Sequence, residues 1–193
     1  MSRIRHFIDE ALHLIYPNVC ICCEALLEEG DRYICQTCKD GFDRFSLPNE
    51  STDEILIRLQ RNFPGQKVIL DAISCYRFHK DGLLQEAIHA MKYGGLRSLA
   101  IQLGGELGEK IRKDRPDMRY GAIVPVPLHQ IKRIERSYNQ SELLATGIAS
   151  VLQVQVLAGA RPHKQGSTFQ NGRRICRRLF AARRRWVWKA SCW

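Results

Sequence analysis

The residues best suited to chemistry are cysteines that stand in two pairs of identical spacing. Cys20 and Cys23 form one C-x2-C pair, Cys35 and Cys38 form the other, and eleven residues separate the pairs. A C-x2-C turn points two thiolates at one ion, and two such turns complete the tetrahedral four-sulfur shell of a structural zinc site. Because that shell leaves no open position, we expect the Zn2+ to stabilise the fold rather than to catalyse a reaction.

Other uses of the cysteines remain open. The same spacing occurs in redox-active pairs, and reduced cysteines can simply be buried in a core. Cys22 does not fit the paired spacing and is interpreted as a spare thiol, and Cys75, which lies in an apolar run, as a core residue rather than a nucleophile. None of the six histidines stands at a spacing typical of metal ligands.

A second stretch with chemical potential is "VPVPLHQIKRIERSYNQSELLA" (124–145). An apolar strand ends there at two prolines, which cannot donate to a sheet, and a basic loop leads to Asn139 and Gln140 at the start of a helix. Ligands bind at the ends of parallel strands, and helix N-termini and arginines suit anions, phosphate above all. The alternative is a solvated basic loop with a capping asparagine.

The elements that would position these residues follow from hydrophobic periodicity and turn signals. Strands alternating with helices predict an α/β protein with a parallel sheet. Helices are expected at 3–15, from Asp81 to Gly94, at 97–113 and at 139–152, and strands at 68–78, at 122–127 and near 154–159. Residues 48–65 are interpreted as a linker with one weak helical stretch.

The cysteine pairs, the "AMKYGG" turn (90–95), "VPVPLH" and "RSYNQSELLA" together resemble the ComF family of competence-associated proteins. The resemblance covers about residues 10–165, in the family's order. It implies an N-terminal four-cysteine zinc ribbon followed by a type I phosphoribosyltransferase-like domain that binds phosphoribosyl pyrophosphate, with Mg2+ in the intact fold. The implied role is in DNA uptake or in phosphoribosyl-pyrophosphate-linked metabolism. Ser137 departs from the family, which usually has glycine there.

The resemblance also implies which residues face the ligand. These are Lys92, Tyr93, Arg136, Asn139 and Gln140, together with Arg161 and Gln165. Phosphoribosyltransferases of this type continue into two acidic residues and a Thr/Gly-rich loop, which hold the ribose hydroxyls and the 5′-phosphate. No Asp or Glu follows Gln165 in this chain, so we expect an incomplete, inactive domain and assign no catalytic residue.

The last part of the chain has a composition unlike the rest. Residues 161–193 hold ten basic and no acidic side chains, which accounts for the whole net charge of +10, and all three tryptophans lie in the last eight residues. If residues 189–193 are taken as the codons AAR-GCN-TCN-TGY-TGG, reading from the third base gives Ser or Gly and then three apolar residues, as the resemblance implies for the family's next strand. We therefore interpret 166–193 as a frameshifted, truncated C-terminus, expected to be disordered.

Two other classes of function compete with this interpretation. As a nucleic-acid-binding accessory protein, the chain would use the zinc ribbon and the basic tail on single-stranded DNA, because arginines follow phosphates and tryptophans stack on bases. As an interaction module, it would dock the zinc ribbon on a protein of the DNA-uptake machinery.

The expected organisation has four parts. They are an N-terminal helix and zinc ribbon (1–46), a linker (47–67), the N-terminal part of the phosphoribosyltransferase-like domain (68–165) and the aberrant basic tail (166–193). Polar residues interrupt the apolar positions of the N-terminus, which argues against a secretory signal. No apolar run approaches the length of a membrane span, and we expect a cytoplasmic protein.

Overall fold

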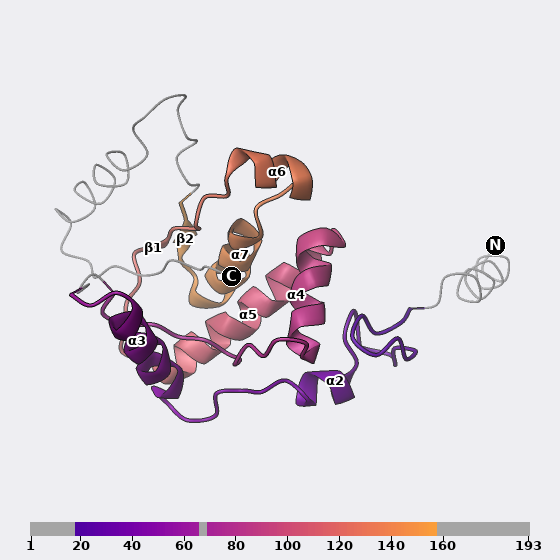
Figure 1. Cartoon of the computed structure of the whole chain (residues 1–193), viewed down its shortest axis with the longest axis horizontal. Coiled ribbons are helices and arrows are strands. Elements are labelled where there is room, and N and C mark those ends of the chain that lie inside the picture. Colours follow the sequence, from indigo (N-terminus) through magenta and orange to yellow (C-terminus); the bar gives the residue numbers. More distant parts are fainter. Residues whose placement is uncertain (1–17, 66–68, 158–193) are drawn as a thin grey trace, which may run out of the picture. The chain divides into compact units, whose positions relative to one another are not determined.

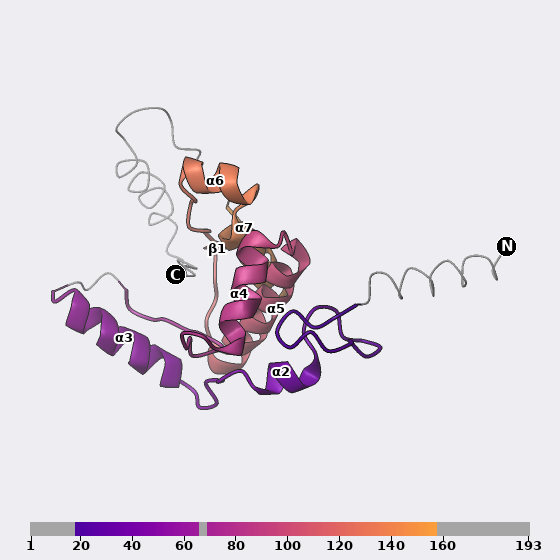
Figure 2. The ribbon, with the colours of Figure 1, turned by 45° about the vertical axis from the view of Figure 1, so that its right-hand side comes forward.

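The computed structural model describes residues 18–65 and 69–157. The helix expected at 3–15, the tail at 166–193, Arg161 and Gln165 therefore lie outside the described residues. The chain divides into two compact units, one within Met1–Arg44 and Tyr76–Gly94, the other within Phe45–Cys75 and Gly95–Trp193 (Figures 1 and 2). Each unit thus takes residues from two separate stretches of the chain, rather than following the expected order of ribbon, linker and domain.

The first unit contains helices α2 (Gln36–Asp40) and α4 (Leu83–Tyr93). An isolated antiparallel bridge between Arg44 and Tyr76 joins its two stretches, and the Arg77 N–H donates to the Asp43 carbonyl at 2.8 Å. The strand expected at 68–78 is wrong for its described part, where the backbone pairing consists of an isolated bridge at Tyr76 and the adjoining hydrogen bonds of Cys75 and Arg77. Its β-branched and aromatic residues favour extended backbone, but no neighbouring strand lies alongside to complete a ladder.

Helix α4 begins one residue later than the sequence indicated. Gly82 is its N-cap, whereas Asp81 lies outside the helix with a φ of 62° and caps no N–H of the first turn. Ala87 and Met91 are buried on the apolar side of the helix, and the helix ends at Gly94. The expected apolar face and stop signal are therefore confirmed, and the expected aspartate cap is wrong.

The second unit is built from α3 (Glu50–Asn62), α5 (Arg97–Asp114), α6 (Gln130–Arg136) and α7 (Gln140–Leu152) with two short strands. Strands β1 (Ala122–Ile123) and β2 (Gln155–Val156) pair in parallel, with Ala122 opposite Gln155. The strand expected at 122–127 stops after two residues, because the prolines at 125 and 127 have no N–H to donate. The basic stretch expected as a loop forms α6.

Helices α5 and α7, which lie side by side in Figure 1, pack closely against each other. Glycines make this possible: a Cβ on Gly104 would lie 2.3 Å from the Leu144 carbonyl oxygen, and one on Gly147 would lie 2.1 Å from the Ile101 carbonyl oxygen. No side chain separates the two backbones at these points. The contact thus depends on glycines, although glycine is a poor helix former.

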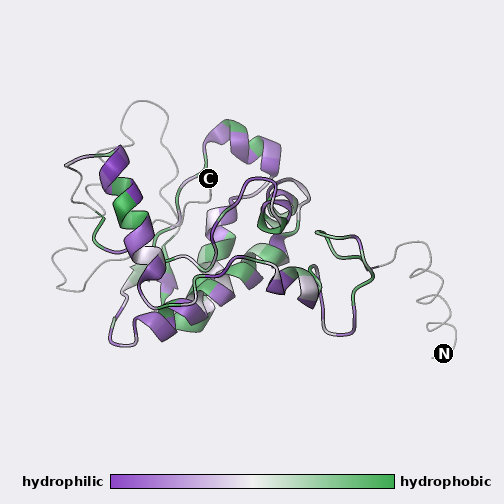
Figure 3. Ribbon diagram, turned by 60° about the horizontal axis from the view of Figure 1, so that its bottom comes forward, coloured by the Kyte–Doolittle hydropathy of each residue, from purple (hydrophilic) through white to green (hydrophobic). Residues whose placement is uncertain are grey.

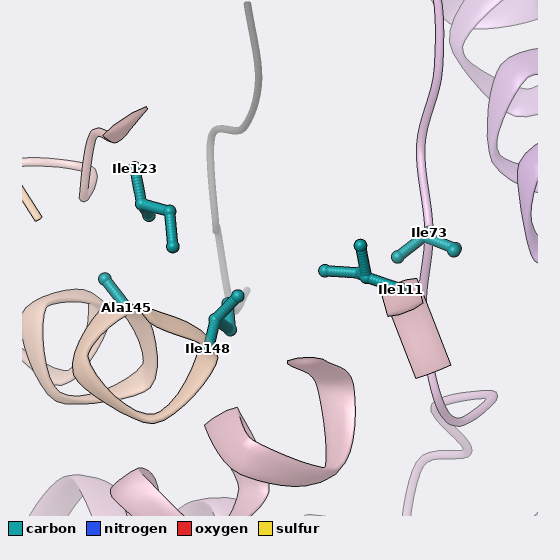
Figure 4. Close-up of a cluster of buried hydrophobic side chains, with 5 residues drawn as sticks. All are labelled: Ile73, Ile111, Ile123, Ala145 and Ile148. Carbon is teal, nitrogen blue, oxygen red and sulfur yellow. The ribbon is translucent and has the colours of Figure 1, made fainter. Parts of the chain in front are cut away.

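A compact apolar cluster lies beside this helix pair (Figure 4). Its members come from β1, α5, α7 and the extended segment before Tyr76, and all are at least 95 % buried: Ile73, Ile111, Ile123, Ala145 and Ile148. Burial of each of the four isoleucine side chains contributes about 1.5–3 kcal/mol relative to exposure. This cluster fixes the strand β1, and with it the start of the loop that leads to α6.

Helix α3 occupies most of the expected linker and carries both hydrophilic and hydrophobic residues (Figure 3). Its N-terminal turn is tied to the following segment by hydrogen bonds: Thr52 Oγ1 donates to the Ala72 carbonyl at 2.6 Å. Arg115 at the end of α5 makes a bidentate pair with the Asp71 carboxylate, both distances being 3.0 Å, and also donates to Thr52 Oγ1 at 2.8 Å. The weak helical stretch expected between residues 48 and 65 is therefore present as α3.

The described residues form a helix-rich fold with a two-stranded parallel sheet and a four-cysteine cluster. A parallel pair is present, as expected for an α/β chain. A wider sheet of phosphoribosyltransferase type is not seen in residues 18–65 and 69–157.

Candidate metal centre

The first cysteine pair lies in a tight hairpin-like turn. The Cys20 N–H donates to the Ala25 carbonyl and the Glu24 N–H donates back to the Cys20 carbonyl, both at 2.8 Å. Val19 and Leu26 form an antiparallel bridge that closes the base of the turn. Glu24 sits in the left-handed region with a φ of 61°, which lets the chain reverse immediately after Cys23.

The second cysteine pair lies at the start of α2. Cys35 is the N-cap of this helix, with extended backbone, and Cys38 lies one turn further along. Asp31 holds the helix start: its Oδ2 accepts from the Gln36 N–H at 3.2 Å and its Oδ1 accepts from Lys39 Nζ at 3.1 Å. Negative charge at a helix N-terminus is favourable, so Asp31 both caps and orients the helix that carries this pair.

The two pairs meet at one point. The Sγ atoms of Cys20, Cys23, Cys35 and Cys38 all lie within 4.8 Å of one another, and those of Cys23 and Cys35 are 3.7 Å apart. Bonds of about 2.3 Å to a tetrahedral zinc would set its sulfur ligands at comparable separations. The four cysteines therefore can hold a metal ion such as zinc, with Cys20 and Cys38 buried and Cys23 exposed.

Backbone amides favour thiolate at one of these sulfurs. The Cys22 and Cys35 N–H groups both donate to Cys20 Sγ at 3.4 Å. Burial of Cys20 raises its pKa, but these donors outweigh burial and lower the pKa to about 6. In Cys38, burial and the neighbouring thiols raise the pKa instead. A cation among the sulfurs would remove this conflict, because it stabilises all four as thiolates.

Cys22 belongs to the same turn but not to the cluster. Its Sγ donates to the Leu83 carbonyl at 3.5 Å, and burial, followed by the charge of Cys20, raises its pKa to about 12. It is therefore a thiol beside the four-sulfur cluster rather than one of its members. This matches its interpretation as a spare thiol.

The structure brings together three of the residues that the family resemblance assigned to phosphoribosyl pyrophosphate. Asn139 is the N-cap of α7: its Oδ1 accepts from the Ser141 N–H at 3.1 Å, and its Nδ2 donates to the Val126 carbonyl at 3.0 Å. Arg136 Nη1 donates to Gln140 Oε1 at 3.4 Å. Asn139 and Gln140 are both buried, so the capping asparagine considered from the sequence is present.

Two other proposed ligand residues belong to the first unit. Lys92 and Tyr93 end helix α4 in the first unit, where the Tyr93 ring lies 4.9 Å from that of His89. Arg136, Asn139 and Gln140 belong to the second unit. Arg161 and Gln165 fall outside the described residues.

Sequence reasoning missed Asp31 as a part of the metal centre. The sequence could have indicated it, because Asp31 lies a few positions before Cys35, where the helix begins. Aspartate commonly accepts hydrogen bonds from the N–H groups of a first helical turn.

Comparison of the chain with protein-family models, with curated proteins and with solved structures finds no match. In the part of the chain that the structure describes, no helix combines the length and apolar character needed to cross a bilayer.

Proposed function

We propose that the four cysteines bind one structural Zn2+ that holds the first unit together. The observation that carries this proposal is the convergence of four sulfurs from two C-x2-C turns within 4.8 Å. An all-thiolate tetrahedral set selects zinc or iron over calcium and magnesium, which require oxygen ligands. The ion would supply folding free energy by linking the turn at Cys20 to helix α2, and would leave no position for a substrate.

Cobalt substitution tests this proposal directly. Co2+ in a tetrahedral thiolate site absorbs strongly in the visible range, so titration of the reduced full chain should give a saturable spectrum at one equivalent. Cys23→Ser should abolish the four-thiolate spectrum. Cys22→Ser, its matched control one residue away, should leave it unchanged, since Cys22 points to Leu83. A spectrum that depends on Cys22 but not on Cys23 would refute the ligand assignment.

We further propose that the chain is a ComF-type protein, as its resemblance to that family suggests. The order of the cysteine pairs, "AMKYGG" and "VPVPLH…RSYNQSELLA" supports this. A parallel β1–helix–β2 unit is also consistent with a doubly wound phosphoribosyltransferase-like sheet, in which ligands bind beyond the carboxyl ends of the strands. The loop and helix with Arg136, Asn139 and Gln140 follow the carboxyl end of β1, where a phosphate ligand would be expected.

The proposed role is in DNA uptake or in phosphoribosyl-pyrophosphate-linked metabolism, without turnover by these 193 residues. The chain has no Asp or Glu after Glu142, and phosphoribosyl transfer needs carboxylates to hold the ribose and Mg2+. Isothermal titration of the zinc-loaded chain with phosphoribosyl pyrophosphate and Mg2+ should therefore show no tight, saturable binding. Saturable binding that Arg136→Gln weakens would overturn this part of the proposal.

A further inference from the structure

The four sulfurs of the metal centre differ sharply in their access to solvent. Cys20 is fully buried and Cys38 is 5 % exposed, whereas Cys23 is exposed and Cys35 is half-buried. The accessible pair takes one cysteine from each C-x2-C turn. A dissolved reagent can therefore reach Cys23 and Cys35, whereas Cys20 and Cys38 are shielded from it.

Hydrogen bonds add to this difference. Cys20 Sγ accepts from two backbone N–H groups, which reduce the electron density available for attack on an electrophile. Cys23 Sγ and Cys35 Sγ lie 3.7 Å apart and face each other across the cluster. A disulfide bond is about 2.05 Å long, so rotation of the two side chains has only a short gap to close.

We propose that Cys23 and Cys35 form a peroxide-sensitive pair whose oxidation to a disulfide opens the metal centre. This inference rests on the proposed zinc site. The Cys23 thiolate attacks a peroxide oxygen, breaks the O–O bond and becomes a sulfenic acid, and the other oxygen leaves as water or alcohol after taking a proton. The Cys35 thiolate then attacks the Cys23 sulfur, the S–S bond forms, and the hydroxyl group leaves as water with a second proton.

The consequence for the metal follows from the ligand count. Two of the four sulfurs are then in the disulfide, and the chain can no longer supply a tetrahedral thiolate shell. Cys20 and Cys38 alone would hold the ion far more weakly, so oxidation of one pair should release one ion. We expect Cys22 to take no part, because its Sγ donates a hydrogen bond to the Leu83 carbonyl at 3.5 Å.

The test uses the full chain loaded with zinc, with its zinc content measured first. Hydrogen peroxide is added in increments, zinc release is followed with a chromophoric chelator, and the first disulfide is mapped by non-reducing peptide mass spectrometry. We expect a Cys23–Cys35 disulfide, one zinc released for each disulfide formed, and recovery of zinc binding after reduction. Cys22→Ser should leave the rate of release unchanged.

The outcomes separate this inference from the proposal on which it rests. A chain that holds no zinc before oxidation refutes the metal centre itself. A zinc-loaded chain whose first disulfide lies within one C-x2-C pair, or includes Cys22, refutes the oxidation proposal and leaves the metal centre intact. Zinc that stays bound after the Cys23–Cys35 disulfide has formed also overturns it.

Discussion

Replacing Gly147 with alanine should disrupt the contact between α5 and α7. The new Cβ would lie 2.1 Å from the Ile101 carbonyl oxygen and 2.7 Å from the Gly105 nitrogen, and both are backbone atoms that no side-chain rotation can move. Ordinary contact begins at 3.4 Å, so the helices must separate locally by about 1.3 Å. A gap of about 0.5–1 Å already forfeits a quarter to a half of a dispersion contact.

The expected loss of stability follows from two opposing terms. Overpacking of this kind costs about 1–3 kcal/mol or more, and a clash with backbone belongs at the upper end of that range. Alanine is a better helix former than glycine by about 1 kcal/mol, which offsets part of the loss. We expect Gly147→Ala to lower the free energy of unfolding by about 2 kcal/mol, measured by urea denaturation followed by circular dichroism with zinc present.

Gly105→Ala is the matched control, because it lies in α5 beside the same contact but a Cβ there meets no atom within 4 Å. It should raise the free energy of unfolding by up to about 1 kcal/mol through helix propensity alone. If Gly147→Ala proves as stable as Gly105→Ala, the close approach of the two helices is wrong.

Three further predictions concern Asp31 at the metal centre, the backbone conformation of Ser137, and the ion pair between Asp71 and Arg115. Asp31→Ala should weaken zinc binding by about 10-fold or more in competition with a chromophoric chelator, whereas Asp31→Asn, which keeps an acceptor for the Gln36 N–H, should retain most of it. Ser137→Gly should raise the urea midpoint by an amount worth about 0.5–1 kcal/mol, because the φ of 62° at this position strains any side chain and suits glycine. Burial raises the pKa of Asp71, but the hydrogen bonds from Arg115 outweigh it and hold that pKa below its usual value. Because the pKa is depressed in the folded state, the pair stabilises the fold above the unfolded pKa of about 3.9 and is lost as the pH falls through the folded pKa. Asp71→Asn should therefore lower stability at pH 7 by about 1–2 kcal/mol and flatten the dependence on pH below 4, as followed by urea denaturation across that range.

The parts of the structure that the sequence predicted are those governed by local rules. A C-x2-C turn needs only four residues, so the convergence of two such turns could be inferred from spacing. The helices α4, α5 and α7 follow from apolar residues every three or four positions, and Asn139 was anticipated as a capping residue because it precedes such a run.

The parts that were not predicted depend on neighbours distant in the chain. The apolar run at 68–78 favours a strand, but a strand also needs a partner, and among the described residues its backbone pairs only around Tyr76, with the short stretch from Asp43 to Phe45. Helix α3 was masked by its mixture of charged and apolar residues, and its first turn is fixed by Asp71, Ala72 and Arg115 rather than by its own sequence. From the sequence alone, the glycines of the α5–α7 contact only lower the expected helix propensity. Their role follows from the backbone of the opposing helix, which leaves no room for a side chain.

The division into units was likewise beyond local reasoning. The first unit takes Tyr76–Gly94 from a stretch that the sequence assigned to a separate domain. The bridge, the contacts of Arg77 with Asp43 and the edge-to-face packing of the Phe42 and Tyr76 rings mark this association, and none of them leaves a periodic signal in the sequence. Only the contact itself identifies it.

Elemental analysis of the full chain, purified under reducing conditions without added chelator, tests the metal centre most directly. The account predicts one zinc atom per chain, with Cys38→Ser lowering zinc content and Cys22→Ser preserving it. A chain that carries no metal after dialysis against stoichiometric zinc, or that retains a full equivalent in Cys38→Ser, would contradict it.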